Sequence, residues 1–464
     1  MELYPHQAQM IGEVRNHLRQ GKRKVLLQGA TGIGKTVMTA FMISQSAARG
    51  KRSMFVVHRQ ELLHQASRTF TKMGIEHGLV APGHSMTRDL VQIGMVQTIG
   101  KRLSVLAVPD LIIIDEAHHS PAGAWAKMIT AWPSAILIGL TATPERLDGK
   151  GMGRQYDAMV LGPPMKWLIA NKFLAPFRVL APPIGINADG VKTQYGDYSR
   201  EELTKVINIP SITGNVLSHY QKHAPGGRAI IFCCSIEHSK NISVSLQATG
   251  IRAVHIDGTS DPRHRQRVMQ LFGAGNIQAL CTVDLISEGF DVPAVEVAIL
   301  LRPTQSLTVH LQQVGRALRY VPDKTALILD HAGNTFRHGL PDDEREWSLS
   351  GRKARKKAPN EEGEIKVTQC DECFACHPPG PVCPNCGRKY ESESDIRMKI
   401  LLQRSGDLEE VDPEKLKKIR AMEVRRARKR EDLEKIAKAR GYNPSWVDHI
   451  LASRDKTFQR MYGV

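Results

Sequence analysis

Two short stretches of this sequence carry residues suited to phosphate chemistry. The first fits the pattern G-x-x-x-x-G-K-[ST] and directly follows a predicted strand over residues 24–28. In such a loop the glycines let backbone N–H groups curl around phosphates, and the N-terminus of the next helix favours negative charge. We expect Lys35 to reach the β- and γ-phosphates and the Thr36 hydroxyl to bind Mg²⁺. The predicted loop consists of Gly29, Ala30, Thr31, Gly32, Ile33, Gly34, Lys35 and Thr36.

The second stretch is an apolar run that ends in two carboxylates. Residues 111–114 are Leu-Ile-Ile-Ile, and Asp115 and Glu116 follow them directly. One carboxylate can hold a magnesium ion while the other polarises the attacking water, so each acid has its own task. Together the two stretches predict an ATP-hydrolysing site that uses ATP and Mg²⁺. In this site Thr36 and Asp115 are the magnesium ligands and Glu116 activates the water.

Short β-branched runs alternate with helix-length segments, which is typical of parallel α/β folds. These runs are too apolar for half-exposed strands, so we expect sheets that are covered on both faces. They form two series, which predict two α/β lobes joined near residues 162–164. The predicted strands are residues 24–28, 54–58, 90–98, 111–115 and 135–141, and then 228–234, 253–257, 279–283, 295–301 and 326–330.

The same periodicity suggests a division of the chain into five parts. The ATP-binding lobe takes residues 1–164, and the second lobe takes residues 165–340. Blocks of charge with glycine and proline then predict a linker. A cysteine-rich segment and a helical, charged tail complete the chain. These last three parts are residues 341–369, 370–390 and 391–464.

Charge and composition narrow the function classes. The chain has 64 Lys and Arg against 47 Asp and Glu, a formal +17, and residues 1–340 account for +13 of it. A basic surface on the lobes predicts a polyanionic partner, and nucleic acid bound through its backbone is the natural one. The first residues do not resemble a secretory signal, and no apolar run approaches the roughly 18 residues of a membrane span. We therefore expect a protein with no membrane association.

Five of the eight cysteines fall within residues 370–386, which favours a metal site in a reducing cytoplasm over a disulfide scaffold. Two C-x₂-C pairs can present four thiolates to one Zn²⁺ in a closed site that folds a small module and leaves no open position for chemistry. The spacing allows two sets of four. The favoured set is Cys370, Cys373, Cys383 and Cys386, and the alternative replaces Cys370 with Cys376.

Asp115-Glu116-Ala117-His118, together with the phosphate-binding loop, resembles superfamily 2 helicases and translocases of the DEAD/DEAH class. The resemblance covers roughly residues 3–334 and implies two tandem RecA-like lobes. It implies that Gln7 bonds the adenine base and that residues 141–143, Thr-Ala-Thr, couple hydrolysis to lobe movement. It also implies nucleic-acid backbone contacts at strand ends of the first lobe, made by His58, Arg59 and Thr98.

In the second lobe the resemblance implies a further set of functional residues. Residues 231–235 and 282–293 resemble two strand-end motifs of the family, in which Ser235 and Thr282 contact the nucleic acid. Gly289 and Asp291 belong to the nucleotide-binding part, with Asp291 on the ribose. The run from Gln312 to Arg319 fits Q-x-x-G-R-x-x-R. Its implied catalytic residues are Gln312 and the two arginine fingers, Arg316 and Arg319.

Within the superfamily, several short strings look most like bacterial RadD-type and phage or prophage helicases, including residues 330–334, Asp-His-Ala-Gly-Asn. This favours DNA over RNA, and a DNA translocase or helicase of replication, recombination or repair in a bacterial or phage-infected cell, near the nucleoid. One alternative is an RNA helicase. The other is an ATP-gated adapter, for which the zinc ribbon or the tail would bind a protein partner.

Overall fold

The computed structural model describes two compact units, Met1–Ala354 with Ile365–Tyr390 and Arg355–Glu364 with Glu391–Val464. No helix in the described part of the chain is long and apolar enough to cross a membrane. The residues described are 2–119, 123–145, 151–181, 193–194, 197–198, 210–283, 295–350, 367–370, 372–373, 375–390, 421–422, 424, 427, 429–440 and 445–452.

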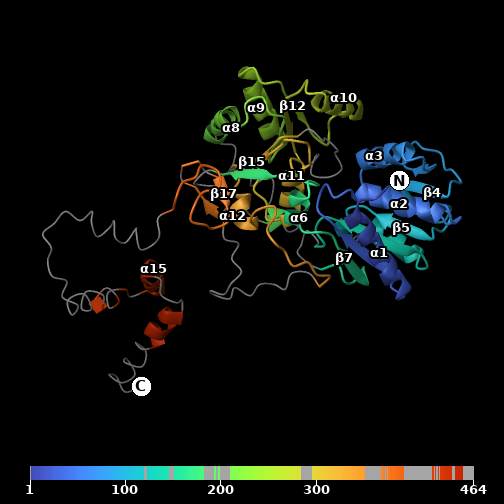
Figure 1. The fold of residues 1–464 in the computed structure, drawn as a ribbon, viewed down its shortest axis with the longest axis horizontal. Helices are drawn as coiled ribbons and strands as arrows, with labels where there is room; N and C mark the ends of the chain where they lie inside the picture. Colours follow the sequence, from blue (N-terminus) through green and yellow to red (C-terminus); the bar gives the residue numbers. More distant parts are fainter. Residues whose placement is uncertain are drawn as a thin grey trace. The chain divides into compact units, whose positions relative to one another are not determined.

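The first lobe is a seven-stranded parallel sheet with helices around it (Figure 1). The strand order is β3-β4-β2-β5-β6-β1-β7, so β1, which leads into the phosphate-binding loop, lies between β6 and β7. Its strands are β1 (Lys24–Gln28), β2 (Ser53–Val57), β3 (Gly78–Val80), β4 (Val91–Met95), β5 (Leu111–Ile114), β6 (Ile136–Thr141) and β7 (Ala158–Leu161). Its helices are α1 (Pro5–Arg19), α2 (Lys35–Ala47), α3 (Gln60–Lys72), α4 (Val96–Arg102), the short 3₁₀ helix η1 (Ala117–His119) and α5 (Ala124–Ala131).

The second lobe is built on an eight-stranded sheet in the order β12-β13-β11-β14-β15-β8-β17-β16. Six of these strands run parallel, and the last two are antiparallel additions from the cysteine-rich segment. The strands are β8 (Phe177–Leu180), β11 (Ala229–Phe232), β12 (Ala253–Ile256), β13 (Ala279–Thr282), β14 (Val297–Leu300), β15 (Ala326–Asp330), β16 (Thr368–Gln369) and β17 (Ala375–His377), beside a separate hairpin of β9 (Thr193–Gln194) and β10 (Asp197–Tyr198). The helices are α6 (Met165–Ala170), α8 (Pro210–His223), α9 (Ile236–Ala248), α10 (Pro262–Gly273), α11 (Leu307–Gly315) and α12 (Asn334–His338).

The fold class expected from the sequence is confirmed: two RecA-like α/β lobes with parallel sheets and a cysteine cluster that follows them. The central strands are fully buried, as the continuous apolar runs predicted. Several strand predictions were too long, since β11 and β14 are shorter than the predicted 228–234 and 295–301, and the predicted strand 90–98 runs into a helix. Helix α4 begins at Val96, so the last three residues of the predicted strand 90–98 are helical. Here a helix follows a strand directly, and the apolar character of the sequence continues across the boundary. Periodicity alone therefore does not locate the end of the strand.

Residues 341–350, the first part of the predicted linker, pack against the rest of the unit. The Arg345 guanidinium donates to four carbonyls, those of His338, Leu340, Pro341 and Asp343, and so folds the segment into a tight turn. Farther along, the Leu349 carbonyl accepts from the Gly153 N–H of the first lobe at 2.8 Å. This segment therefore connects the end of the second lobe back to the first.

In the second unit, α15 (Arg430–Arg440) and a helical stretch over residues 445–452 share a small apolar cluster. Leu433, Ala437 and Val447 are buried in it together with Ala427. Arg430 bridges the two helical stretches through an ion pair with Asp448, at 2.6 Å between Nη2 and Oδ1. Most of the remaining residues of the predicted tail, including 391–420 and 453–464, lie outside the described residues.

Candidate functional site

The phosphate-binding loop lies where the sequence places it, between β1 and α2. Gly32 and Gly34 adopt φ angles of 94° and 88°, which are left-handed values that favour glycine. A Cβ on Gly34 would lie 2.4 Å from the Gln7 amide nitrogen, and a Cβ on Gly29 would lie 2.9 Å from Ile33. The glycines therefore let the loop curl tightly, and α2 begins at Lys35, so the N-terminus of the helix directly adjoins the loop.

Lys35 lies among the other predicted catalytic charges. Its Nζ donates to the carbonyl of Gly29 at 2.9 Å. Burial lowers the pKa of this ammonium, and the nearby carboxylates of Glu116 and Asp115 oppose that shift. The positive charges of Arg316 and Arg319 add to the lowering of the Lys35 pKa. The two acids of the first lobe and the two arginines of the second lobe therefore all act electrostatically on this one lysine.

Glu116 stands in a strained backbone conformation just after β5. Its φ of 48° is a left-handed value that costs a residue with a side chain on the order of 1 kcal/mol or more. Its backbone N–H donates to the Asp115 carboxylate at 3.1 Å. His118, which is almost completely buried, brings Nδ1 within 3.4 Å of the Glu116 carboxylate. Such strain is common at active sites, and here it holds the two acids on one tight turn.

A series of polar contacts leads from Glu116 to the second lobe. His118 Nδ1 lies 3.3 Å from Thr141 Oγ1, and Thr141 donates its hydroxyl proton to the Thr143 carbonyl at 2.7 Å. Because that proton is committed, the His118 contact requires a proton on Nδ1. The Thr143 hydroxyl then meets the hydroxyl of Thr308, on α11, at 2.8 Å. The segment predicted to couple hydrolysis to lobe movement thus touches both the acidic turn and the second lobe.

Helix α11 presses its C-terminal end against the phosphate-binding loop. A Cβ on Gly315 would lie only 2.8 Å from the Thr31 Cβ, so the two backbones approach as closely as a glycine permits. Arg316 follows directly, and both Arg316 and Gln312 are buried. Burial lowers the Arg319 pKa to about 10, although the guanidinium stays charged at neutral pH. The predicted arginine fingers therefore directly follow a helix that already touches the loop, with Arg316 as its C-cap and Arg319 three residues beyond.

A second polar contact joins the lobes away from this cluster. Arg265 on α10 pairs with Glu61 on α3, with 2.7 Å between Nη1 and Oε1. Both side chains are largely shielded from solvent. Neither this pair nor Thr308 was found from the sequence, because each partner lies more than 160 residues away and belongs to no local pattern.

Gln7 lies at the start of α1 and contacts the loop directly. Its Nε2 donates to the Ile33 carbonyl at 2.9 Å, and its Oε1 accepts from the Tyr4 N–H at 3.1 Å. An amide group has two donors and two acceptor lone pairs, so one of each remains for a base. Four aromatic rings gather beside it: Tyr4, His6, Trp167 and Phe173.

The residues predicted to contact nucleic acid lie at the carboxyl ends of parallel strands. His58 and Arg59 follow β2, and Thr98 lies on α4 after β4. In the second lobe, Ser235 follows β11 as the N-cap of α9, where its hydroxyl accepts from the His238 N–H at 3.2 Å. Thr282 ends β13 and is fully buried. Each set of strand ends shares one edge of its sheet, the edge where ligands of such sheets bind.

The site fits a nucleoside triphosphate and its metal. The positive-φ glycines form a cradle that side chains would fill, and Thr36 and Asp115 offer oxygen ligands suited to Mg²⁺. In the second lobe, the buried Gln312 Nε2 has no hydrogen-bond partner among the described residues and can serve a ligand. Gly289 and Asp291, predicted for nucleotide binding, lie outside the described residues.

Four cysteines of the ribbon segment come together. The sulfurs of Cys370, Cys373, Cys383 and Cys386 all lie within 4.8 Å of one another, with the pairs Cys370–Cys386 and Cys373–Cys383 at 3.6 and 3.7 Å. A tetrahedral site with Zn–S bonds of about 2.3 Å places its sulfurs roughly 3.8 Å apart, so the spacing suits Zn²⁺. Cys376 lies apart from this group on β17, and burial raises its pKa to about 12. The geometry matches the favoured set.

Known protein families match both lobes. The family described as "Type III restriction enzyme, res subunit" matches residues 1–146, and the one described as "Helicase conserved C-terminal domain" matches residues 210–321. The first match spans the phosphate-binding loop and both acids. The second spans α11 and the two arginines that follow it.

Individual relatives agree with these matches. A 51.5 kDa protein of a Lactococcus phage (isolate 7-9) is 36% identical over 393 residues, which are 84% of this chain and 83% of the phage protein. The DNA 3'-5' translocase XPB2 of Sulfurisphaera tokodaii is 22% identical over 372 residues, 71% of this chain and 81% of that protein. A solved fragment described as an HsdR subunit of a Vibrio vulnificus type I restriction enzyme has the same fold, with a TM-score of 0.58 and 23% identity over 73% of this chain and 65% of that one.

Two RecA-like lobes that enclose a phosphate-binding loop, paired acids and facing arginines define an ATP-hydrolysing motor of the helicase type. The chain belongs to the superfamily 2 helicases, in one family with the phage 51.5 kDa protein.

Proposed function

We propose that this helicase is a DNA-dependent ATPase that moves along DNA or remodels it, in phage or bacterial DNA replication, recombination or repair. The observation that carries the proposal is the series of contacts from Glu116 to Thr308. It connects the acidic turn of one lobe to the helix of the other lobe that leads into the two arginines. A change in charge or position at Glu116 during hydrolysis can thereby alter how tightly the lobes hold each other.

In this proposal the two lobes divide the chemistry. In the first lobe Lys35 neutralises the terminal phosphates, Thr36 and Asp115 hold Mg²⁺, and Glu116 orients the attacking water. The second lobe supplies Gln312, Arg316 and Arg319, and the arginines stabilise charge that develops on the transferred phosphoryl group. Since these groups meet only when the lobes close, ATP favours the closed arrangement and hydrolysis releases it.

Charge supports a nucleic-acid track, and the relatives favour DNA. The two lobes carry +13, and the strand-end residues His58, Arg59, Thr98, Ser235 and Thr282 are the proposed backbone contacts. Contacts to phosphates carry little sequence information, so binding is indifferent to sequence. The family that matches the first lobe is named after a type III restriction enzyme, and one relative is a DNA 3'-5' translocase. Both names refer to proteins that act on DNA. The expected compartment is the cytoplasm of a bacterial or phage-infected cell.

We further propose that the four clustered cysteines bind one structural Zn²⁺. Four thiolates close the coordination sphere, so this metal stabilises the ribbon and takes no part in hydrolysis. The ribbon or the tail remains the candidate surface for a protein partner.

We expect tracking along a duplex to be stronger than strand separation, because a grip on the phosphates of one strand does not require unpaired bases. The test compares ATP-dependent displacement of the third strand of a DNA triplex with unwinding of a tailed duplex. ATPase rates are measured in parallel with single-stranded, duplex and forked DNA and with RNA. Glu116→Gln is the control that should retain ATP and DNA but lose turnover.

Triplex displacement that requires ATP and is absent in Glu116→Gln, with weak unwinding, supports the proposal. Affinity for DNA should also fall by roughly 10³ or more between 50 and 200 mM salt if about six phosphates are neutralised. If RNA stimulates the ATPase and DNA does not, the proposal that the enzyme moves on DNA is wrong and RNA is its substrate. Parent-like hydrolysis in Glu116→Gln would remove this residue from its proposed role.

A further inference from the structure

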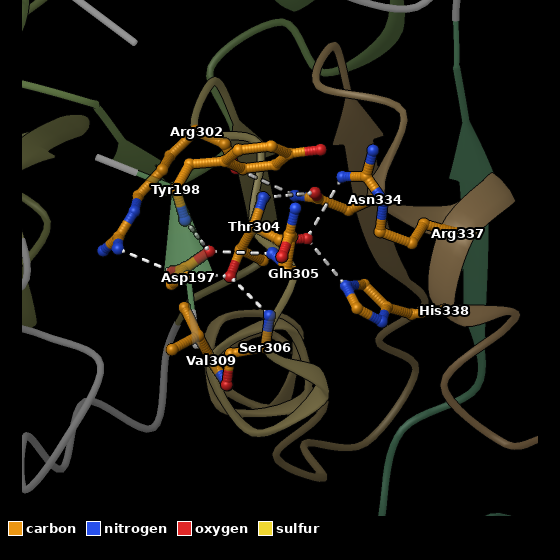
Figure 2. Close-up of polar contacts among 10 residues, drawn as sticks. All are labelled: Asp197, Tyr198, Arg302, Thr304, Gln305, Ser306, Val309, Asn334, Arg337 and His338. Atoms are coloured by element: carbon orange, nitrogen blue, oxygen red, sulfur yellow. Dashed lines mark hydrogen bonds and ion pairs between the residues drawn. The ribbon is translucent and has the colours of Figure 1, made fainter. Parts of the chain in front are cut away.

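An aspartate outside every predicted site lies at the centre of a polar network in the second lobe (Figure 2). Asp197, on the short strand β10, accepts two hydrogen bonds at Oδ2, from Arg302 Nη2 at 2.9 Å and from Thr304 Oγ1 at 2.8 Å. Its Oδ1 accepts from the Gln305 N–H at 2.7 Å. All three partners belong to the connection from β14 to α11, more than 100 residues farther along the chain.

The network continues directly into the first turn of α11. The Thr304 hydroxyl, which donates to Asp197, accepts from the Ser306 N–H at 3.0 Å. Ser306 is the N-cap of the helix, and its own hydroxyl accepts from the Val309 N–H at 3.4 Å. A capping serine satisfies an N–H group that would otherwise have no partner at the helix start. The Asp197 carboxylate therefore supports the residue that begins α11.

The same connection is held from its other side by α12, as Figure 2 shows. The Asn334 amide accepts from the Thr304 N–H and donates to the Arg302 carbonyl, each at 2.9 Å. Arg337 donates to the Thr304 carbonyl at 3.3 Å, and its guanidinium lies over the ring of Tyr198 at 5.1 Å. Thr304 and Asn334 are fully buried. A segment with bonds on both sides has little freedom to shift.

The Asp197–Arg302 ion pair contributes more to the position of the connection from β14 to α11 than to the stability of the fold. Their side chains are 16% and 9% exposed, so both charges are largely removed from water. Burying such a pair gains little net stability, but removing one partner leaves a costly uncompensated charge. The Asp197 carboxylate instead fixes the position of the connection from β14 to α11, because it accepts from a guanidinium, a hydroxyl and a backbone N–H of that segment.

We infer that Asp197 is a positioning residue for ATP hydrolysis, which acts through α11. This helix touches the first lobe near its start, where Thr308 meets Thr143, and at its end, where Gly315 meets Thr31. A displaced first turn would shift Arg316 along with the helix. The inference rests on the proposed function, since it requires the arginines to act on the bound nucleotide.

The test is Asp197→Asn, which keeps the size of the side chain but replaces one accepting oxygen with a donor. We expect kcat to fall by about 10- to 100-fold, because a misplacement of about 1 Å in a catalytic group costs on that order. The affinity for a fluorescent ATP analogue should stay within about twofold, since the loop and acids of the first lobe are untouched. The matched control is Asp261→Asn, a carboxylate that caps α10 in the same lobe and should behave as the parent does.

A double variant separates positioning from a merely structural role. If Asp197 acts by positioning Arg316, Asp197→Asn should have almost no further effect in an Arg316→Ala background, whereas independent effects would multiply. Thr304→Val gives the same test without altering a charge, and decides the outcome if Asp197→Asn does not fold. If Arg316→Ala is impaired, the inference alone is overturned by a parent-like kcat in Asp197→Asn or Thr304→Val, or by effects that multiply in the double variant. A parent-like Arg316→Ala overturns the proposed catalytic role of that arginine instead.

Discussion

The contact between Gly315 and Thr31 gives a prediction whose size follows from the structure. In Gly315→Ala the new methyl carbon would lie 2.8 Å from the Thr31 Cβ, 3.1 Å from its Cγ2 and 3.2 Å from its Oγ1. Carbon atoms prefer separations of about 3.5–4.0 Å, so the end of α11 must retreat from the loop by roughly 1 Å. Since overpacking of this kind costs about 1–3 kcal/mol, closure of the lobes on ATP should weaken by that amount.

If closure precedes hydrolysis, this cost lowers the DNA-stimulated ATPase rate by about 5- to 150-fold, because about 1.4 kcal/mol is worth a factor of ten. The rate is measured at saturating ATP and DNA, and nucleotide affinity is measured without DNA by titration with a fluorescent analogue. Affinity should change little. The matched control is Gly273→Ala on α10, where a Cβ meets no atom within 4 Å. A rate within twofold of the parent would refute the inferred link between this contact and catalysis.

Three further predictions concern the arginine finger, the metal and acid stability. Arg319→Ala should lower kcat by on the order of 10³, and a fall of less than tenfold would contradict its proposed role. Cys370→Ser and Cys383→Ser should each lose the zinc on measurement of metal content, whereas Cys376→Ser should keep about one equivalent; loss of zinc from Cys376→Ser but not from Cys370→Ser would exchange the ligand sets. Burial lowers the His238 pKa to about 4, so the unfolded chain binds the proton more tightly and stability falls as pH drops from 6.5 towards 4. His238→Leu should therefore lose less stability between pH 7 and 4.5, by about 2 kcal/mol, in denaturation measured at both values.

Features set by local residue patterns could be predicted from the sequence. The strands β1 and β15 have the bounds that their apolar runs suggest, and the phosphate-binding loop lies between a strand and a helix as its motif requires. The two cysteine pairs also meet, because C-x₂-C spacing directs both thiols to one point.

Features that depend on distant partners could not be predicted in this way. The bond between Thr143 and Thr308 spans 165 residues, and the network around Asp197 joins residues more than 100 apart. Single polar residues in loops have no periodicity that distinguishes a network member from a solvated side chain. The pairing of β17 with β8 could not be predicted for a similar reason, because a strand of three residues is too short to show a periodic pattern.

That pairing gives the ribbon a consequence for solubility. Strand β8 would otherwise end the sheet of the second lobe, with a row of backbone N–H and C=O groups free to pair with another chain. β17 covers this edge, and β16, only two residues long, becomes the new border. Short border strands are one way in which natural sheets avoid edge-to-edge aggregation. Loss of the ribbon, by truncation or by removal of its metal, would therefore expose the β8 edge to pairing with other chains. The protein would then aggregate although its ATP site is unchanged.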